Sequence, residues 1–82
     1  HGIGRSLHED PHVFCFLAGP ISETPKLEVG MTLAVEVMMN EGGSDVVITE
    51  GGWHAETADG SRSLQLEHTI LITPHDPEIL TK

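Results

Sequence analysis

Two histidines and two glutamates are the residues of this sequence best suited to chemistry. His1 and His8 are seven positions apart, and the glycines beside His1 let a ligand approach the backbone closely. Glu36 and Glu67 fall in apolar, strand-like runs, where a carboxylate is costly unless it pairs or binds a metal. We interpret these four residues as part of a metal centre.

Each candidate also has a purely structural interpretation. Glu36 could be an edge-strand glutamate that reaches water. His68 shares the apolar face of its run, where a lone histidine is more often a packed residue than a ligand. Trp53 could anchor a hairpin and cover the sheet. The pattern alone leaves these alternatives open.

Composition limits the class of protein. Eighty-two residues make one small domain at most, here a single partial domain spanning 1–82, with a marginal core. A net charge of −9 repels phosphate and anionic lipid, so we expect no nucleic-acid or membrane partner. Cys15 is the only cysteine, and no apolar run reaches the roughly 20 residues of a membrane span. We expect a soluble, cytoplasmic protein, and we expect truncation because the chain starts at histidine.

The apolar pattern predicts short strands separated by turns. Val35 and Val37 favour a strand over a helix in the methionine-rich run, where Ala34 and Glu36 share one face. Gly51-Gly52 supplies the positive φ values of a tight hairpin. We expect a loop at 18–26 and strands at 12–17, 27–40, 45–50, 53–57, 63–73 and 78–81. The fold class is therefore a mainly antiparallel β-sheet.

A series of motifs then gives a specific resemblance over essentially the whole chain. In order, they are His1-Gly2-Ile3-Gly4, His8-Glu9-Asp10-Pro11, Gly30-Met31, Glu36, Asn40, Gly52-Trp53, Gln65-Leu66-Glu67-His68-Thr69 and Glu78-Ile79-Leu80-Thr81. This order and spacing resemble the C-terminal part of type I methionine aminopeptidases. The resemblance implies the α+β pita-bread fold, a dinuclear metal centre and removal of the initiator methionine from new proteins.

The resemblance also implies metal-binding roles. His1 and Glu36 would be ligands to one metal, and Glu67 would bridge two. Imidazole and carboxylate groups suit Mn²⁺, Fe²⁺, Co²⁺ or Zn²⁺, and two divalent ions of this kind would be the cofactors. Such ions activate water and polarise the scissile carbonyl.

Further residues match the family positions that handle substrate. His8 would hydrogen-bond the substrate, and Glu36 would also relay a proton to the leaving amine. Leu7 and Trp53 would line the pocket for the N-terminal methionine of a peptide or nascent protein. Gln65 would orient Glu67 as a supporting hydrogen-bonding group.

Several features depart from the family pattern. Val29 and Val37 replace usual prolines, Cys15 stands where His or Asn is favoured, and Leu66 replaces an aromatic residue. The family centre also takes two aspartates and a histidine from segments before His1. We therefore expect weak metal affinity and little activity from these 82 residues alone.

Three functions remain open on the sequence. The first is a methionine aminopeptidase of which this chain is a C-terminal fragment. The second is a non-catalytic pita-bread binding module, although such a protein has no need to keep costly acids without a metal. The third is another dinuclear peptidase, such as an Xaa-Pro aminopeptidase.

Overall fold

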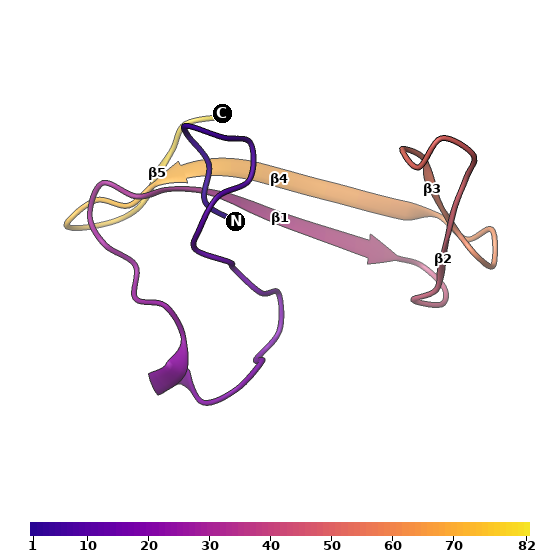
Figure 1. Cartoon of the computed structure of the whole chain (residues 1–82), viewed down its shortest axis with the longest axis horizontal. Helices are drawn as coiled ribbons and strands as arrows, with labels where there is room; N and C mark the ends of the chain where they lie inside the picture. Colours follow the sequence, from indigo (N-terminus) through magenta and orange to yellow (C-terminus); the bar gives the residue numbers. More distant parts are fainter. The chain divides into compact units, whose positions relative to one another are not determined.

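The computed structural model describes all residues from 1 to 82, and almost all of its regular structure is strand. A three-stranded sheet has the order β1-β4-β5, and β2 pairs with β3 in a two-stranded sheet (Figure 1). The elements are the 3₁₀ helix η1 (Ile21–Glu23) and the strands β1 (Thr32–Asn40), β2 (Val46–Ile48), β3 (Ala55–Thr57), β4 (Ser63–Leu71) and β5 (Glu78–Ile79). The predicted mainly antiparallel fold is confirmed.

The chain divides into two compact units, which we describe separately. The site unit comprises residues 1–36 and 67–82, and the hairpin unit comprises residues 37–66. No helix has the length and apolar character that crossing a membrane would require.

In the site unit, the first three residues lie along the start of β1 (Figure 1). The backbone nitrogen of His1 donates to the carbonyl of Ala34 at 3.0 Å, and the Ala34 nitrogen donates to the His1 carbonyl at 2.8 Å. One pair along, the Ile3 nitrogen donates to the Thr32 carbonyl at 3.2 Å, and the Thr32 hydroxyl donates back to the Ile3 carbonyl. This pairing fixes His1 against the strand that carries Glu36.

Gly2 allows the segment after His1 to fold back on itself. Its nitrogen donates to the Pro11 carbonyl at 2.9 Å, and its carbonyl accepts from the Glu9 nitrogen at 3.0 Å. A Cβ at Gly2 would collide with the carbonyl of Asp10, so the close approach requires glycine. The loop between these contacts brings His8 back towards His1.

The other strands of the site unit, β4 and β5, continue the sheet from β1. Just before β1, Gly30 adopts a φ of 94°. Its backbone nitrogen donates to the Ile72 carbonyl at 2.8 Å, and the Ile72 nitrogen donates to the Met31 carbonyl at 2.8 Å. On the other edge of β4, Ile70 pairs with Ile79 in an antiparallel register. The positive φ of Gly30 bends the chain, so that β1 starts beside the end of β4.

The hairpin unit contains the turn that the sequence predicts. Val46 pairs with Thr57 and Ile48 with Ala55, and Gly51 and Gly52 between them have φ values of 97° and 73°. Because L-residues rarely adopt positive φ, two glycines suit this connection. The strands are shorter than predicted but begin and end within the predicted ranges.

The core is as small as the chain length implies. Leu33 and Ala34, each 1% exposed, are the only buried hydrophobic residues. Large apolar side chains such as Met38, Val46 and Trp53 remain exposed. Hydrogen bonding between strands therefore contributes much of what holds each unit together.

One strand prediction is wrong. Residues 12–17 form no strand, and Phe14, Phe16 and Leu17 are 56%, 68% and 71% exposed. The apolar run suggested a buried strand, but a strand also needs a neighbouring edge to pair with. Here the Phe14 ring instead packs against Phe16, with 5.4 Å between centroids.

Candidate metal centre

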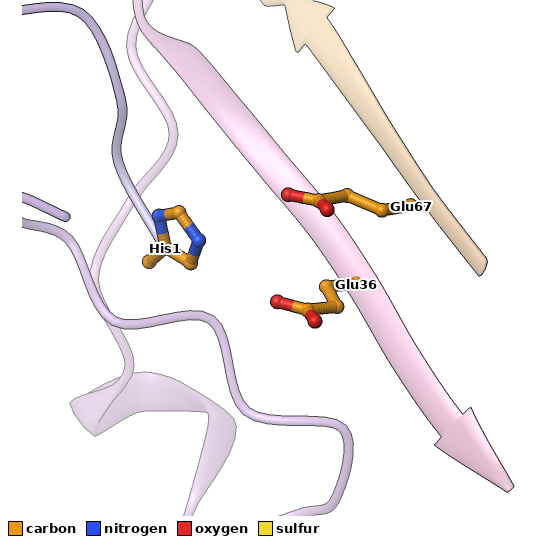
Figure 2. Close-up of side chains that lie close together, drawn as sticks. All are labelled: His1, Glu36 and Glu67. Carbon is orange, nitrogen blue, oxygen red and sulfur yellow. The ribbon is translucent and has the colours of Figure 1, made fainter. Parts of the chain in front are cut away.

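Three residues far apart in the sequence meet in the site unit. One ligand atom each from His1, Glu36 and Glu67 lies within 4.8 Å of the other two. Figure 2 shows both carboxylates extending towards the imidazole, Glu36 from β1 and Glu67 from β4, which run in opposite directions. The structure thus brings together the three residues for which the resemblance implied metal binding.

Strand geometry explains how Glu36 reaches this position. Side chains two apart in a strand share a face, so Glu36 shares a face with Ala34, whose backbone pairs with His1. Because Ala34 has only a methyl group, it leaves space beside the glutamate. Glu36 is half-buried and Glu67 is exposed.

A hydrogen bond orients the imidazole of His1. Its Nδ1 lies 2.9 Å from the carbonyl oxygen of Gly2. A carbonyl can only accept, so the hydrogen bond requires the proton on Nδ1 and leaves the lone pair of Nε2 available. Histidine metal ligands are commonly held in this way, with one ring nitrogen bonded to a backbone carbonyl.

His8 lies directly beside the cluster. Its ring centroid is 4.4 Å from that of His1, with the ring planes inclined at 53°. Both rings line a pocket of about 630 Å³ within the site unit. The pocket is lined by His1, His8, Glu9, Asp10, His12, Val13, Ala34 and Glu36. A ligand in this pocket would contact His8, which lies outside the cluster, together with His1 and Glu36, which belong to it.

Sequence reasoning assigned no role to three of the residues that line this pocket, Glu9, Asp10 and His12. The sequence does contain a sign of their role, because four ionisable side chains lie within the five positions His8-Glu9-Asp10-Pro11-His12. Folding of the loop onto Gly2 then turns this run towards the cluster.

Cys15 supports the backbone next to the cluster. Its thiol donates to the carbonyl of Glu36, with Sγ and the oxygen 3.2 Å apart. The side chain that departs from the family pattern therefore contacts the main chain of a candidate ligand. A thiol is a weak donor, so this contact contributes modestly to the position of β1.

The structure places the other predicted site residues outside this pocket. Leu7 is 68% exposed and does not line it. His68, for which the sequence favoured a packed structural role, is exposed, and its Nδ1 atom lies 3.1 Å from the hydroxyl of Thr81. Trp53, 97% exposed, and Gln65 belong to the hairpin unit, where both line an open hollow of about 760 Å³. Their roles towards substrate and Glu67 stay predictions.

Two acids of the hairpin unit, Asp59 and Glu41, accept hydrogen bonds from neighbouring donors. Asp59 accepts from the backbone nitrogens of Gly43 at 2.8 Å and Ser61 at 2.9 Å. Hydrogen bonds from Ser61 and Gly43 lower the pKa of Asp59 from its ordinary value of 3.8 to about 2. A two-pronged hydrogen bond from Arg62, at 2.9 and 3.0 Å, likewise lowers the pKa of Glu41.

The donor set of the cluster fits a divalent cation. One imidazole and two carboxylates are nitrogen and oxygen ligands of the kind that Mn²⁺, Fe²⁺, Co²⁺ and Zn²⁺ accept. The ligand atoms lie within 4.8 Å of one another, so a single ion between them could contact all three after small side-chain movements. The orientation of His1 described above adds to this fit.

Curated proteins that are similar to this chain carry the same name, methionine aminopeptidase. The chain is 49% identical over 81 residues to a methionine aminopeptidase of Clostridium perfringens, covering 99% of this chain and 32% of that protein. It is 42% identical to methionine aminopeptidase 1 of Bacillus subtilis, covering all of this chain and 32% of that protein. The chain thus spans about a third of the length of the curated relatives it matches.

Solved structures show the same relationship. The methionine aminopeptidase of Thermotoga maritima superposes with a TM-score of 0.88 and 52% identity, covering 100% of this chain and 32% of that one. The methionine aminopeptidase of Rickettsia prowazekii gives 0.86 and 38%, covering 100% and 33%. Residues 1–74 match the model of metallopeptidase family M24. The chain belongs to metallopeptidase family M24.

Proposed function

We propose that this chain is the C-terminal part of a methionine aminopeptidase, which removes the initiator methionine from new proteins in the cytoplasm. The observation that carries the proposal is the cluster of His1, Glu36 and Glu67, whose ligand atoms lie within 4.8 Å of one another. The names of the similar proteins and the match to a metallopeptidase family support it. The net charge of −9 supports peptide substrates over nucleic acid or anionic membranes.

In this proposal the cluster holds divalent metal ions. His1 would hold a metal ion through Nε2, since Nδ1 is engaged by the Gly2 carbonyl, and Glu36 and Glu67 would hold metal through their carboxylates. When bound, such ions polarise the scissile carbonyl and make water a better nucleophile. The carboxylates also keep the centre anionic enough to attract the cations.

The remaining residues handle the peptide. The imidazole of His8, 4.4 Å from the His1 ring between centroids, donates a hydrogen bond to the scissile carbonyl oxygen as negative charge develops there. Glu36 takes a proton from the attacking water and passes it to the departing amine. The resemblance assigns Leu7 and Trp53 to the methionine side chain and Gln65 to the support of Glu67.

The test uses the protein as its host produces it. We expect it, loaded with Mn²⁺ or Co²⁺, to release free methionine from Met-Gly-Ala-Ala and to leave Ala-Pro-Ala-Ala uncleaved. Glu67→Gln, which keeps the shape of the side chain but removes its charge, should lose this activity. Cleavage of the Ala-Pro peptide alone would favour an Xaa-Pro aminopeptidase. No cleavage of either peptide, despite bound metal, would favour a binding module.

A further inference from the structure

His12 is a pocket residue to which the proposed mechanism gives no task. It lines the pocket of about 630 Å³ together with His1, His8 and Glu36. It also lines an adjoining apolar recess of about 180 Å³ whose walls include Val13, Phe14, Phe16, Leu17 and Leu27. His12 and Val13 are lining residues of both hollows, so they lie between the two.

The ring of His12 is supported from one side. Its centroid is 5.7 Å from that of Phe14, with 35° between the ring planes. Aromatic contact at this separation favours a limited set of ring orientations. The Phe14 ring in turn packs against Phe16. The imidazole is thus held by neighbours on the same segment while the side chain remains exposed.

The pocket offers a peptide a path to this residue. A substrate whose first residue lies at the cluster can continue along the pocket that His1 and Glu36 line, and each further residue advances the chain by about 3.3–3.6 Å. His12 lines the same pocket, and its neutral ring offers one donor and one acceptor. Glu9 and Asp10, which also line the pocket, are acceptors only when ionised.

We infer that His12 is a substrate-contacting, specificity-determining residue that hydrogen-bonds the peptide backbone after the scissile bond and thereby favours longer peptides over single-residue substrates. This inference rests on the proposed function, because it assumes that a peptide N-terminus lies at the cluster. It assigns the role to His12 alone, with Phe14 as the residue that positions it.

The kinetic test compares two substrates in the protein as its host produces it. One is the tetrapeptide Met-Gly-Ala-Ala, and the other is methionine joined to a fluorogenic amine, which has no peptide after the scissile bond. We expect His12→Ala to lower the ratio of the two kcat/KM values about tenfold, the size of one lost hydrogen bond. His12→Gln, which can still donate, should restore most of the ratio. An unchanged ratio in His12→Ala would overturn the inference.

A binding measurement separates this inference from the proposed function. The tetrapeptide is titrated without added metal into protein with ¹³C-labelled histidine rings, and the His12 signal is identified by its loss in His12→Gln. We expect the tetrapeptide to shift the His12 signal more than methionine amide does. If the protein cleaves neither substrate, the proposed function fails, but a peptide-dependent shift still supports a role for His12. Equal shifts, or none, would refute it.

His75→Ala is the matched control. His75 is an exposed histidine outside the lining of the pocket, and its backbone nitrogen donates to the Thr73 hydroxyl at 3.2 Å. We expect this variant to keep both the substrate ratio and the His12 signal of the unsubstituted protein. A fall in the ratio equal to that in His12→Ala would show that loss of any histidine is enough, which contradicts the inference.

Discussion

Two acids of the hairpin unit, Asp59 and Glu41, have different neighbours from the two glutamates of the cluster. In the hairpin unit, Asp59 accepts from the amides of Gly43 and Ser61, and Glu41 pairs with Arg62. In the site unit, Glu36 and Glu67 converge on each other and on an imidazole. Asp59 and Glu41 tie parts of the hairpin unit together, whereas two carboxylates that converge on one imidazole form a set of ligand atoms. The single contact of Glu56 with His54 in the hairpin unit lacks the second carboxylate. We therefore expect substitutions at the cluster to change metal binding, and substitutions at Asp59 to change stability without changing metal binding.

The largest effect is expected at the cluster itself. Glu67→Ala should abolish tight metal binding, lowering affinity by more than about 100-fold, since even supporting groups around a metal contribute 10–100-fold. Metal content after dialysis, measured by atomic emission, would check this. Glu78→Ala removes another exposed acid of the site unit and should keep its metal. Equal loss in both variants would mean that net charge, not the cluster, retains the ion.

The next effect separates binding from chemistry inside the site unit. His8→Ala should keep the metal content of the unsubstituted protein but lower kcat by about 10²–10³-fold, the usual loss of one donor to a developing oxyanion. Metal content and steady-state kinetics on the same preparation would test this. Metal loss as large as that of Glu67→Ala would show that His8 is itself a ligand, which contradicts its assigned role.

A smaller effect is expected where the loop folds onto Gly2. The added Cβ of Gly2→Ala would meet the carbonyl of Asp10, and overpacking of this kind costs about 1–3 kcal/mol. We expect a lower Tm together with weaker metal binding, because the same contacts hold His1 and His8. Gly19→Ala has open space around it and is the control. An unchanged Tm in Gly2→Ala would argue against the tight approach of this loop.

The smallest effect should be confined to the hairpin unit and should depend on pH. The folded pKa of Asp59, about 2, lies below its ordinary value of 3.8, so the unfolded chain binds this proton more readily. Its contribution to stability is therefore present above about pH 4 and is lost as the pH falls from 4 to 2.

Thermal melts at pH 6, 4 and 2 would measure this contribution. Asp59→Ala should lower the Tm by roughly a few degrees at pH 6, with a difference that narrows by pH 2, and should leave metal content unchanged. Glu50→Ala, which removes an exposed acid of the same unit, corrects for the change in net charge. If Asp59→Ala lowered the Tm as much at pH 2 as at pH 6, the ionised carboxylate of Asp59 would not be the stabilising group.

The sequence predicted those features of the fold that depend only on neighbouring residues in the chain. The turn at Gly51-Gly52 follows from positive φ, and the shared face of Ala34 and Glu36 follows from the two-residue repeat of a strand. The strand expected at 12–17 failed because apolar character does not reveal whether an edge is available for pairing.

The meeting of Glu67 with His1 could not be derived from local patterns. It depends on β4 lying beside β1 and on their alignment, which is a long-range property of the sheet. The resemblance to a family supplied it instead. His12 was missed because its place in the pocket depends on the backbone contacts of Gly2, which no spacing in the sequence shows.

The most direct test of the central claim is a crystal structure of the protein, as its host produces it, grown with Mn²⁺ and measured at the manganese absorption edge. We predict an anomalous peak about 2.0–2.2 Å from Nε2 of His1 and from carboxylate oxygens of Glu36 and Glu67. A peak elsewhere in the protein, with this cluster bound only to water, would contradict the assignment of His1, Glu36 and Glu67 as a metal centre.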